Sequence, residues 1–88
     1  MSSHVATLEF IYESTDVARI VAESVVPEVD ELADERSRTA VERAGRTVTI
    51  TVHARDLSAL RAGLNTWFAL ADVAEVGARV GSSSDTRV

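Results

Sequence analysis

The chain has 88 residues, no cysteine and a formal net charge of −5 at pH 7. The lack of cysteine excludes disulfides, thiolate metal sites and thiol nucleophiles. All basic residues are arginine, and the acidic balance argues against a free-standing nucleic-acid-binding protein, which needs a basic surface.

A chain of this length makes one small domain. We expect its folded core at about residues 4–80 and a disordered tail at residues 81–88, which are small and polar. Oligomerisation is the expected source of added stability. The acidic, lysine-free composition is typical of a salt-loving archaeon. Neither a signal peptide nor a membrane-spanning run is present, so we expect a soluble cytoplasmic protein.

The first half of the chain predicts a strand and then a helix. Residues His4–Tyr12 alternate between apolar and polar, as a half-buried strand does. A helix follows from about Asp16 to Val26 and ends at Pro27. The acidic stretch Glu28–Glu35 is expected to be a solvated connection.

The second half predicts a hairpin and a long helix. Arg36–Arg43 is a weak, charged strand, and Thr47–Ala54 has the strongest strand pattern in the chain. Gly45 suits the turn between them. Asp56 is placed to cap a helix that runs to Val80. The large apolar face of this helix, which we assign to the sheet, contains Leu57, Leu60, Leu64, Trp67, Phe68 and Ala71. A second face is apolar and mostly small, with Ala59, Ala62, Gly63, Ala69, Leu70 and Val73.

The order β-α-β-β-α predicts an α+β fold of the ferredoxin-like kind that lacks its last strand. The expected three-stranded antiparallel sheet has the Thr47–Ala54 strand in the centre and both helices on one face. One edge, at Arg36–Arg43, is charged, but the first strand carries only Glu9. Pairing of that open edge with a second copy would give a homodimer with a six-stranded sheet. The residues expected at this seam are Thr7, Leu8, Glu9, Phe10 and Ile11.

No motif predicts catalysis, a cofactor or a metal site. His53 and Asp56 lack a third ligand, and we interpret them as a strand histidine and a helix cap. Arg36, Arg38 and Arg46 could contact RNA phosphates, although protection of the sheet edge is the favoured interpretation.

The segment DLSALRAGLNTWF resembles the Pcc-type small subunit of the archaeal KEOPS complex (EKC in eukaryotes). The preceding TVTITVHA strand and the earlier ERSRT segment share this resemblance, which covers residues 4 to about 80. Its most specific pattern contains Asp56, Leu57, Leu60, Arg61, Ala62 and Asn65.

The resemblance implies a non-catalytic homodimeric scaffold that binds the Kae-type, ATPase-fold subunit through its helices. The complex attaches threonylcarbamoyl to an adenosine of tRNA, and the small subunit aids tRNA engagement. One departure from the family is the acidic, lysine-free surface, which disfavours direct contact with tRNA. The residues expected to meet the partner are Ala18, Ala22, Val25, Ala59, Ala62, Gly63, Leu70 and Val73. The alternative function is a small homodimeric ligand-sensing module of ferredoxin-like fold, which needs a polar pocket at the dimer seam.

Overall fold

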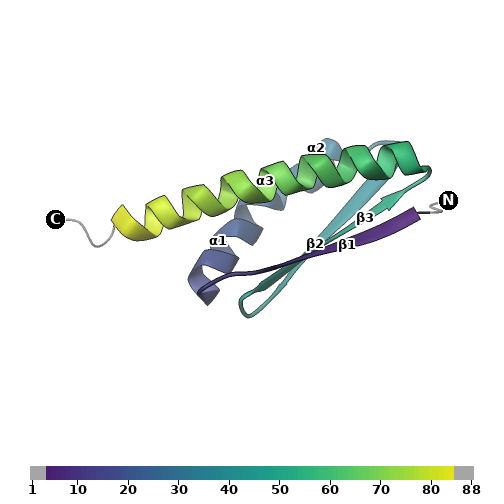
Figure 1. The fold of residues 1–88 in the computed structure, drawn as a ribbon. Helices are drawn as coiled ribbons and strands as arrows, with labels where there is room; N and C mark the ends of the chain where they lie inside the picture. The colour runs from purple at the N-terminus through teal and green to yellow at the C-terminus, as the bar shows by residue number, and fades with distance from the viewer. Residues whose placement is uncertain (1–3, 85–88) are drawn as a thin grey trace.

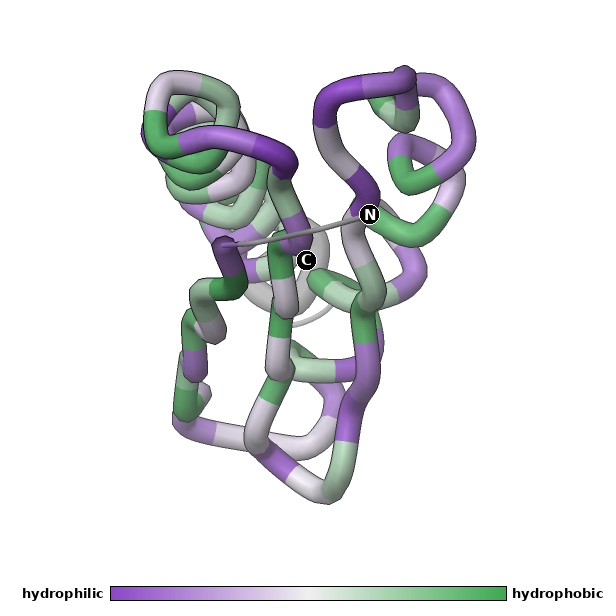
Figure 2. Tube along the Cα trace, turned by 90° about the vertical axis from the view of Figure 1, so that its right-hand side faces the viewer, coloured by the Kyte–Doolittle hydropathy of each residue, from purple (hydrophilic) through white to green (hydrophobic). Residues whose placement is uncertain are grey.

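The computed structural model describes residues 4–84 and has the predicted α+β architecture. The strands pair antiparallel in the order β1-β3-β2, so the third strand is central as expected. The helices cover one face of this sheet, and the other face is open (Figures 1 and 2). The elements are β1 (His4–Ile11), α1 (Thr15–Val25), α2 (Pro27–Leu32), β2 (Ser37–Ala44), β3 (Thr47–Ala54) and α3 (Leu57–Ser84).

The central strand β3 supplies the middle of the core. Its apolar side chains are buried beneath the helices, while its threonines face the open side and are half-exposed. In the paired register, Ile50 lies between Leu8 of β1 and Val41 of β2. Gly45 has a φ of 60° in the turn between β2 and β3. This left-handed conformation suits glycine in a short hairpin.

The stretch that we expected to be a solvated connection contains the six-residue helix α2. Pro27 does end α1, but it also occupies the first turn of α2, where its missing N–H has no helical partner to lose. The carboxylates of Glu28 and Asp30 lie in the same turn, at the positive end of the helix dipole. The acidic composition therefore fits a helix start as well as a loop.

The orientation of α3 differs from our expectation. Trp67 and Ala71 are buried against the sheet as predicted, but Phe68 is 51% exposed and Leu57 is 60% exposed. The small residues Ala59 and Gly63 instead lie on the inner side of the helix. Small side chains let the helix axis approach the sheet closely, and Leu57 and Phe68 lie toward the flank of the helix.

The helix α3 is much longer than the strands beneath it. Its 28 residues span roughly 42 Å at 1.5 Å per residue. The C-terminal part therefore extends past the end of the sheet, alongside α1 (Figure 1). The helix continues to Ser84, four residues beyond the predicted Val80. The remainder of the expected disordered tail, residues 85–88, lies outside the described residues.

Candidate protein-protein interface

An exposed apolar row runs along the outer side of α3. Val73, Val76 and Val80 are 70%, 57% and 64% exposed. With the exposed Ala69 they follow a spacing of four, three and four residues, and the exposed Ala62 lies one heptad before Ala69. This is the spacing of a coiled-coil seam, in which each side chain inserts between four residues of a facing helix. We call these five residues the outer row.

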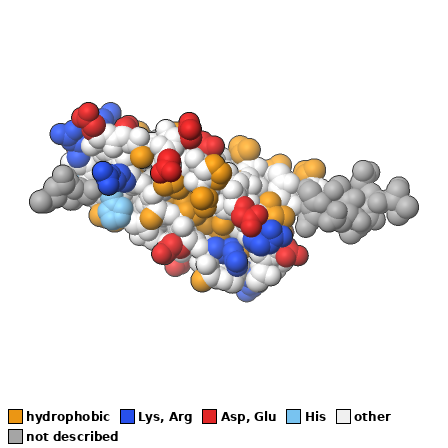
Figure 3. All heavy atoms as spheres, turned by 180° about the vertical axis from the view of Figure 1, so that it is seen from behind, with side chains coloured by type: hydrophobic (Ala, Val, Ile, Leu, Met, Phe, Trp, Pro, Cys, Tyr) orange, Lys and Arg blue, Asp and Glu red, His pale blue; other side chains and the backbone are white. Residues whose placement is uncertain are grey.

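The outer row borders a groove of about 390 Å³ between α1 and α3. Leu70, Val73 and Gly77 line its α3 side, and Ile20 and Ser24 line its α1 side. Figure 3 shows hydrophobic side chains gathered in the middle of the molecule as seen from behind, with acidic side chains near them. The groove and the outer row together leave apolar surface exposed that the core of the domain does not bury.

Several residues expected at the partner interface are instead part of the internal core. Ala18, Ala22 and Val25 are 0%, 8% and 2% exposed, and Ala59 is 4% exposed. Ala18, Ala22 and Val25 belong to α1, which packs against α3, and they lie in the core. Gly63 is half-buried and faces Val52 in the sheet. Ala18, Ala22 and Ala59 therefore offer little free surface in the isolated domain, whereas Val25 lies at the floor of the α1–α3 groove.

Of the expected partner residues, Ala62, Leu70 and Val73 retain accessible surface on the outer side of α3. The structure adds Val76 and Val80, which the sequence analysis did not include. Their signal was present in the sequence as the continued three-and-four spacing. We missed them because the expected face was defined by small side chains.

The outer edge of β1 has no partner strand among residues 4–84. Thr7, Glu9 and Ile11 are exposed on the open side of the sheet, and Leu8 and Phe10 are half-buried on the helix side. The ring of Phe10 meets the exposed Phe68 edge-on, with 5.8 Å between ring centroids. All five residues expected at the dimer seam therefore lie along an accessible strand edge.

A group of charged residues fixes the C-terminal part of α3 to the end of β1. Arg79 contacts the carboxylates of both Glu13 and Glu75. The Tyr12 hydroxyl is buried nearby and has no hydrogen-bond partner among the described residues. Burial raises the pKa of Tyr12, and Glu75 and Asp72 raise it further, while Arg79 opposes them. This contact holds the outer row in place where α3 has left the sheet.

The start of α3 is fixed by Asp56, as predicted. Its carboxylate accepts a hydrogen bond of 2.7 Å from the Ala59 amide and lies 3.7 Å from the Arg36 guanidinium. The pKa of Asp56 is lowered, first by the Ala59 amide and then by Arg36 and Arg55. Arg36 thus has a structural role at this helix cap.

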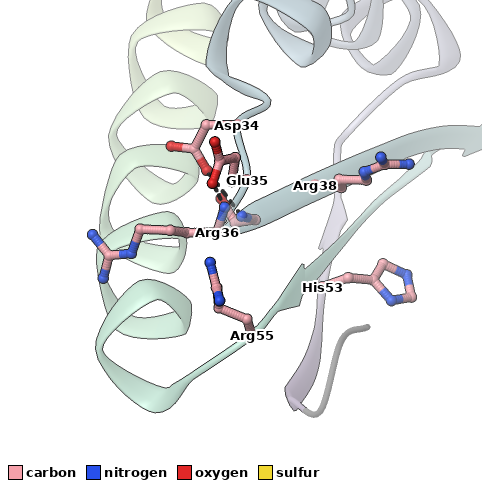
Figure 4. A pocket seen from close by; sticks show the side chains of 7 residues that line it. Asp34, Glu35, Arg36, Arg38, His53 and Arg55 are labelled. Atoms are coloured by element: carbon pink, nitrogen blue, oxygen red, sulfur yellow. Dashed lines mark hydrogen bonds between the residues drawn. The ribbon is translucent and has the colours of Figure 1, made fainter.

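The three arginines considered for RNA contact do not form one surface. Arg36 and Arg38 line a polar hollow of about 520 Å³ at the start of β2, together with His53 and Arg55. Arg46 lies in the turn at the other end of β2. In the hollow, Arg38 and His53 point away from α3, whereas Arg36 points toward it (Figure 4). Asp34 and Glu35 in the same hollow offset much of the positive charge.

In residues 4–84, no three histidine, aspartate or glutamate side chains are grouped so that they could hold a metal ion. Within the same range, none of the helices combines the length and the apolar character needed to cross a membrane. The candidate site is the pair of surfaces formed by the outer row and the β1 edge.

Comparisons with known proteins show what this chain is similar to. The chain resembles a chain in a solved structure titled "Crystal structure of binary complex Gon7-Pcc1", with 15% identity and a TM-score of 0.78. The match covers 91% of this chain and 98% of that chain, and at this identity it shows a shared fold. No curated protein matches. The model of the family described as "Transcription factor Pcc1" matches residues 5–76. Since this match spans most of its length, the chain belongs to the Pcc1 family.

Proposed function

We propose that this chain is a non-catalytic scaffold subunit of the KEOPS complex. It forms a homodimer and binds the Kae-type subunit, and it thereby supports threonylcarbamoyl-adenosine modification of tRNA. Family membership supports the assignment to KEOPS, and the similar solved chain was crystallised with a protein partner. The family description names a transcription factor, but a net charge of −5 favours a protein scaffold over a DNA-binding protein.

The observation that carries the proposal is the outer row of α3. Three consecutive valines of a coiled-coil spacing are more than half exposed on a helix that extends past its own sheet. Exposed side chains of this kind would be left in water unless a second helix covered them. A helix pair from the Kae-type subunit that packs on the outer row and into the α1–α3 groove would complete a helical bundle.

The homodimer is proposed to form at the β1 edge. An unpaired strand edge with a single acidic residue is an efficient template for pairing with another strand. The opposite edge, β2, carries Arg38, Glu42 and Arg43, which disfavour the same kind of pairing. The two proposed surfaces lie on different sides of α3, so one chain can occupy both at once.

Contact with tRNA stays a secondary part of the proposal. Arg36 and Arg38 are the residues best placed for it, and Arg46 would need a separate phosphate at the other end of the sheet. The alternative, a ligand-sensing module, receives less support. The polar hollow lies at β2 and β3, whereas this function needs a polar pocket at the β1 seam.

Co-purification with the Kae-type subunit tests the proposal. The double variant Val73→Glu/Val76→Glu places two carboxylates in the outer row and should abolish co-purification. Both side chains are exposed, so the fold and the dimer mass should not change. The control Asn65→Glu adds one carboxylate at another exposed position of α3 and should bind normally. Normal binding by the double variant would refute the outer row as the docking surface.

A further inference from the structure

The sequence of β1 restricts how this strand can align with β1 of a second copy. We propose that the two-fold axis of the dimer passes through Leu8, so that Leu8 lies opposite Leu8 of the second copy. In this register Thr7 lies opposite Glu9, and Val5 lies opposite Ile11. The inference rests on the proposed homodimer and adds the register in which the strands pair.

The alternation of β1 sets the first restriction. Thr7, Glu9 and Ile11 face the open side of the sheet, and Leu8 and Phe10 face the helices. A two-fold axis perpendicular to the sheet makes the strands antiparallel and keeps the helices of both copies on one face. Residues that lie opposite each other then come from the same face. Only registers centred on one residue of β1 meet this condition.

Charge excludes the register centred on Glu9. That register would place the two Glu9 carboxylates directly opposite each other, with Cβ atoms about 5 Å apart, and like charges in this position are destabilising. With the axis at Leu8, each Glu9 lies opposite Thr7, whose hydroxyl can donate a hydrogen bond to the carboxylate. The two Glu9 residues are then offset by roughly 7 Å along the strands.

Two exposed apolar side chains select Leu8 over the neighbouring axis at Thr7. Val5 and Ile11 are 56% and 68% exposed at opposite ends of β1. The axis at Leu8 pairs Val5 with Ile11 twice, once on each side, and so covers all four side chains. The axis at Thr7 would place Ile11 beyond the partner strand and would set Glu9 against Val5.

The helix-facing side of β1 fits the same register. Phe10 lies opposite Ala6, and this pairs a large side chain with a small one. Phe10 already meets Phe68 of α3 edge-on at 5.8 Å, and Phe68 is half-exposed on this flank. The small Ala6 of the second copy leaves room for this aromatic pair at the seam.

Disulfide cross-linking of the full chain tests the register, since the chain has no cysteine of its own. A disulfide forms when the two Cα atoms are about 4.4–6.8 Å apart, so only directly opposite positions should link. Leu8→Cys should cross-link with itself under mild oxidation. Thr7→Cys and Glu9→Cys should each stay largely uncross-linked alone and should form a mixed disulfide when co-expressed. This second pair lies on the open face and does not depend on any effect of the Leu8 substitution on packing.

Light scattering of the same reduced samples separates the outcomes. Self-linking by Thr7→Cys or Glu9→Cys, with dimer mass retained, would overturn the register and leave the homodimer in place. Dimer mass without any cross-link would show that another surface forms the dimer, and would also overturn the register. Monomer mass for the unmodified chain would refute the homodimer of the proposed function itself.

Discussion

Gly63 of α3 lies directly over Val52 of β3. A methyl group at Gly63 would come within 3.0 Å of the Val52 Cγ1 atom, which is closer than ordinary van der Waals contact. Val52 is fully buried in the central strand and has little freedom to move. The glycine therefore sets how closely the N-terminal half of α3 approaches the sheet.

We expect Gly63→Leu to lower the free energy of unfolding by about 1–3 kcal/mol, as overpacking does. The matched control is Gly77→Ala on the same helix. A Cβ at Gly77 meets nothing within 4 Å, and alanine should stabilise the helix by about 0.5–1 kcal/mol. Urea unfolding of both variants decides the matter. Equal effects of the same sign would mean that Gly63 does not limit the approach.

The adjacent aromatic residues Trp67 and Phe68 should differ sharply in their contribution to stability. Trp67 is 2% exposed, whereas Phe68 is 51% exposed. Trp67→Ala should therefore destabilise the fold by about 3–5 kcal/mol. Phe68→Ala should have a much smaller effect on unfolding of the monomer. Thermal or urea unfolding measures both, and comparable losses would place Phe68 in the core.

The element order and the strand positions could be predicted because they depend on local patterns. The alternation in Thr47–Ala54, the glycine turn before it and the Asp56 cap each have a local physical cause. The rotation of α3 could not be predicted in the same way. Apolar residues lie on both sides of this helix, with Ala59 and Gly63 on one side and Phe68 on the other. Periodicity alone therefore does not say which side faces the sheet.

The interface was harder to predict than the fold. Small side chains such as Ala18 and Ala22 suit close helix packing within a domain as well as between domains. Only the three-dimensional arrangement shows that α3 already occupies the surface beside them. The exposed valines reveal the free surface, because they lie on the side of α3 opposite the buried Trp67, Ala71 and Ala78.

Stability should fall at high pH because of Tyr12. Its pKa is raised in the folded protein, chiefly by burial, while an unfolded tyrosine ionises near pH 10. The unfolded chain therefore loses this proton first, so the contribution of Tyr12 to stability is constant below about pH 10 and falls as pH rises toward the folded pKa.

Tyr12 is the only tyrosine of the chain, so ultraviolet titration of tyrosinate reads its ionisation directly. Tyr12→Phe removes a buried hydroxyl without a partner and should be as stable as the parent or more so at neutral pH. The same variant should lose most of the decline above pH 10. A parent titration at the ordinary tyrosine pKa would contradict the assigned burial.

Salt should stabilise the domain, because its acidic residues are unevenly distributed. Fourteen acidic residues face nine arginines in the chain. Glu23, Glu28, Asp30, Glu31, Asp34 and Glu35 follow one another without an intervening arginine. Their repulsion extends over about 10 Å at 0.1 M salt and over about 3 Å at 1 M. Molar salt should therefore raise the melting temperature relative to dilute buffer.

The exposed ion pairs of Arg19, Arg36 and Arg79 act in the opposite direction, since salt screens them as well. Each such pair contributes about 0–1 kcal/mol, and we expect the repulsion within the acidic stretch to be larger. The variant Glu31→Gln/Glu35→Gln separates the two effects, because neither residue forms one of these pairs. It should melt higher than the parent in dilute buffer and should respond less to added salt. If the parent melts at the same temperature at low and molar salt, the acidic stretch does not govern stability and the salt-loving interpretation of the composition is wrong.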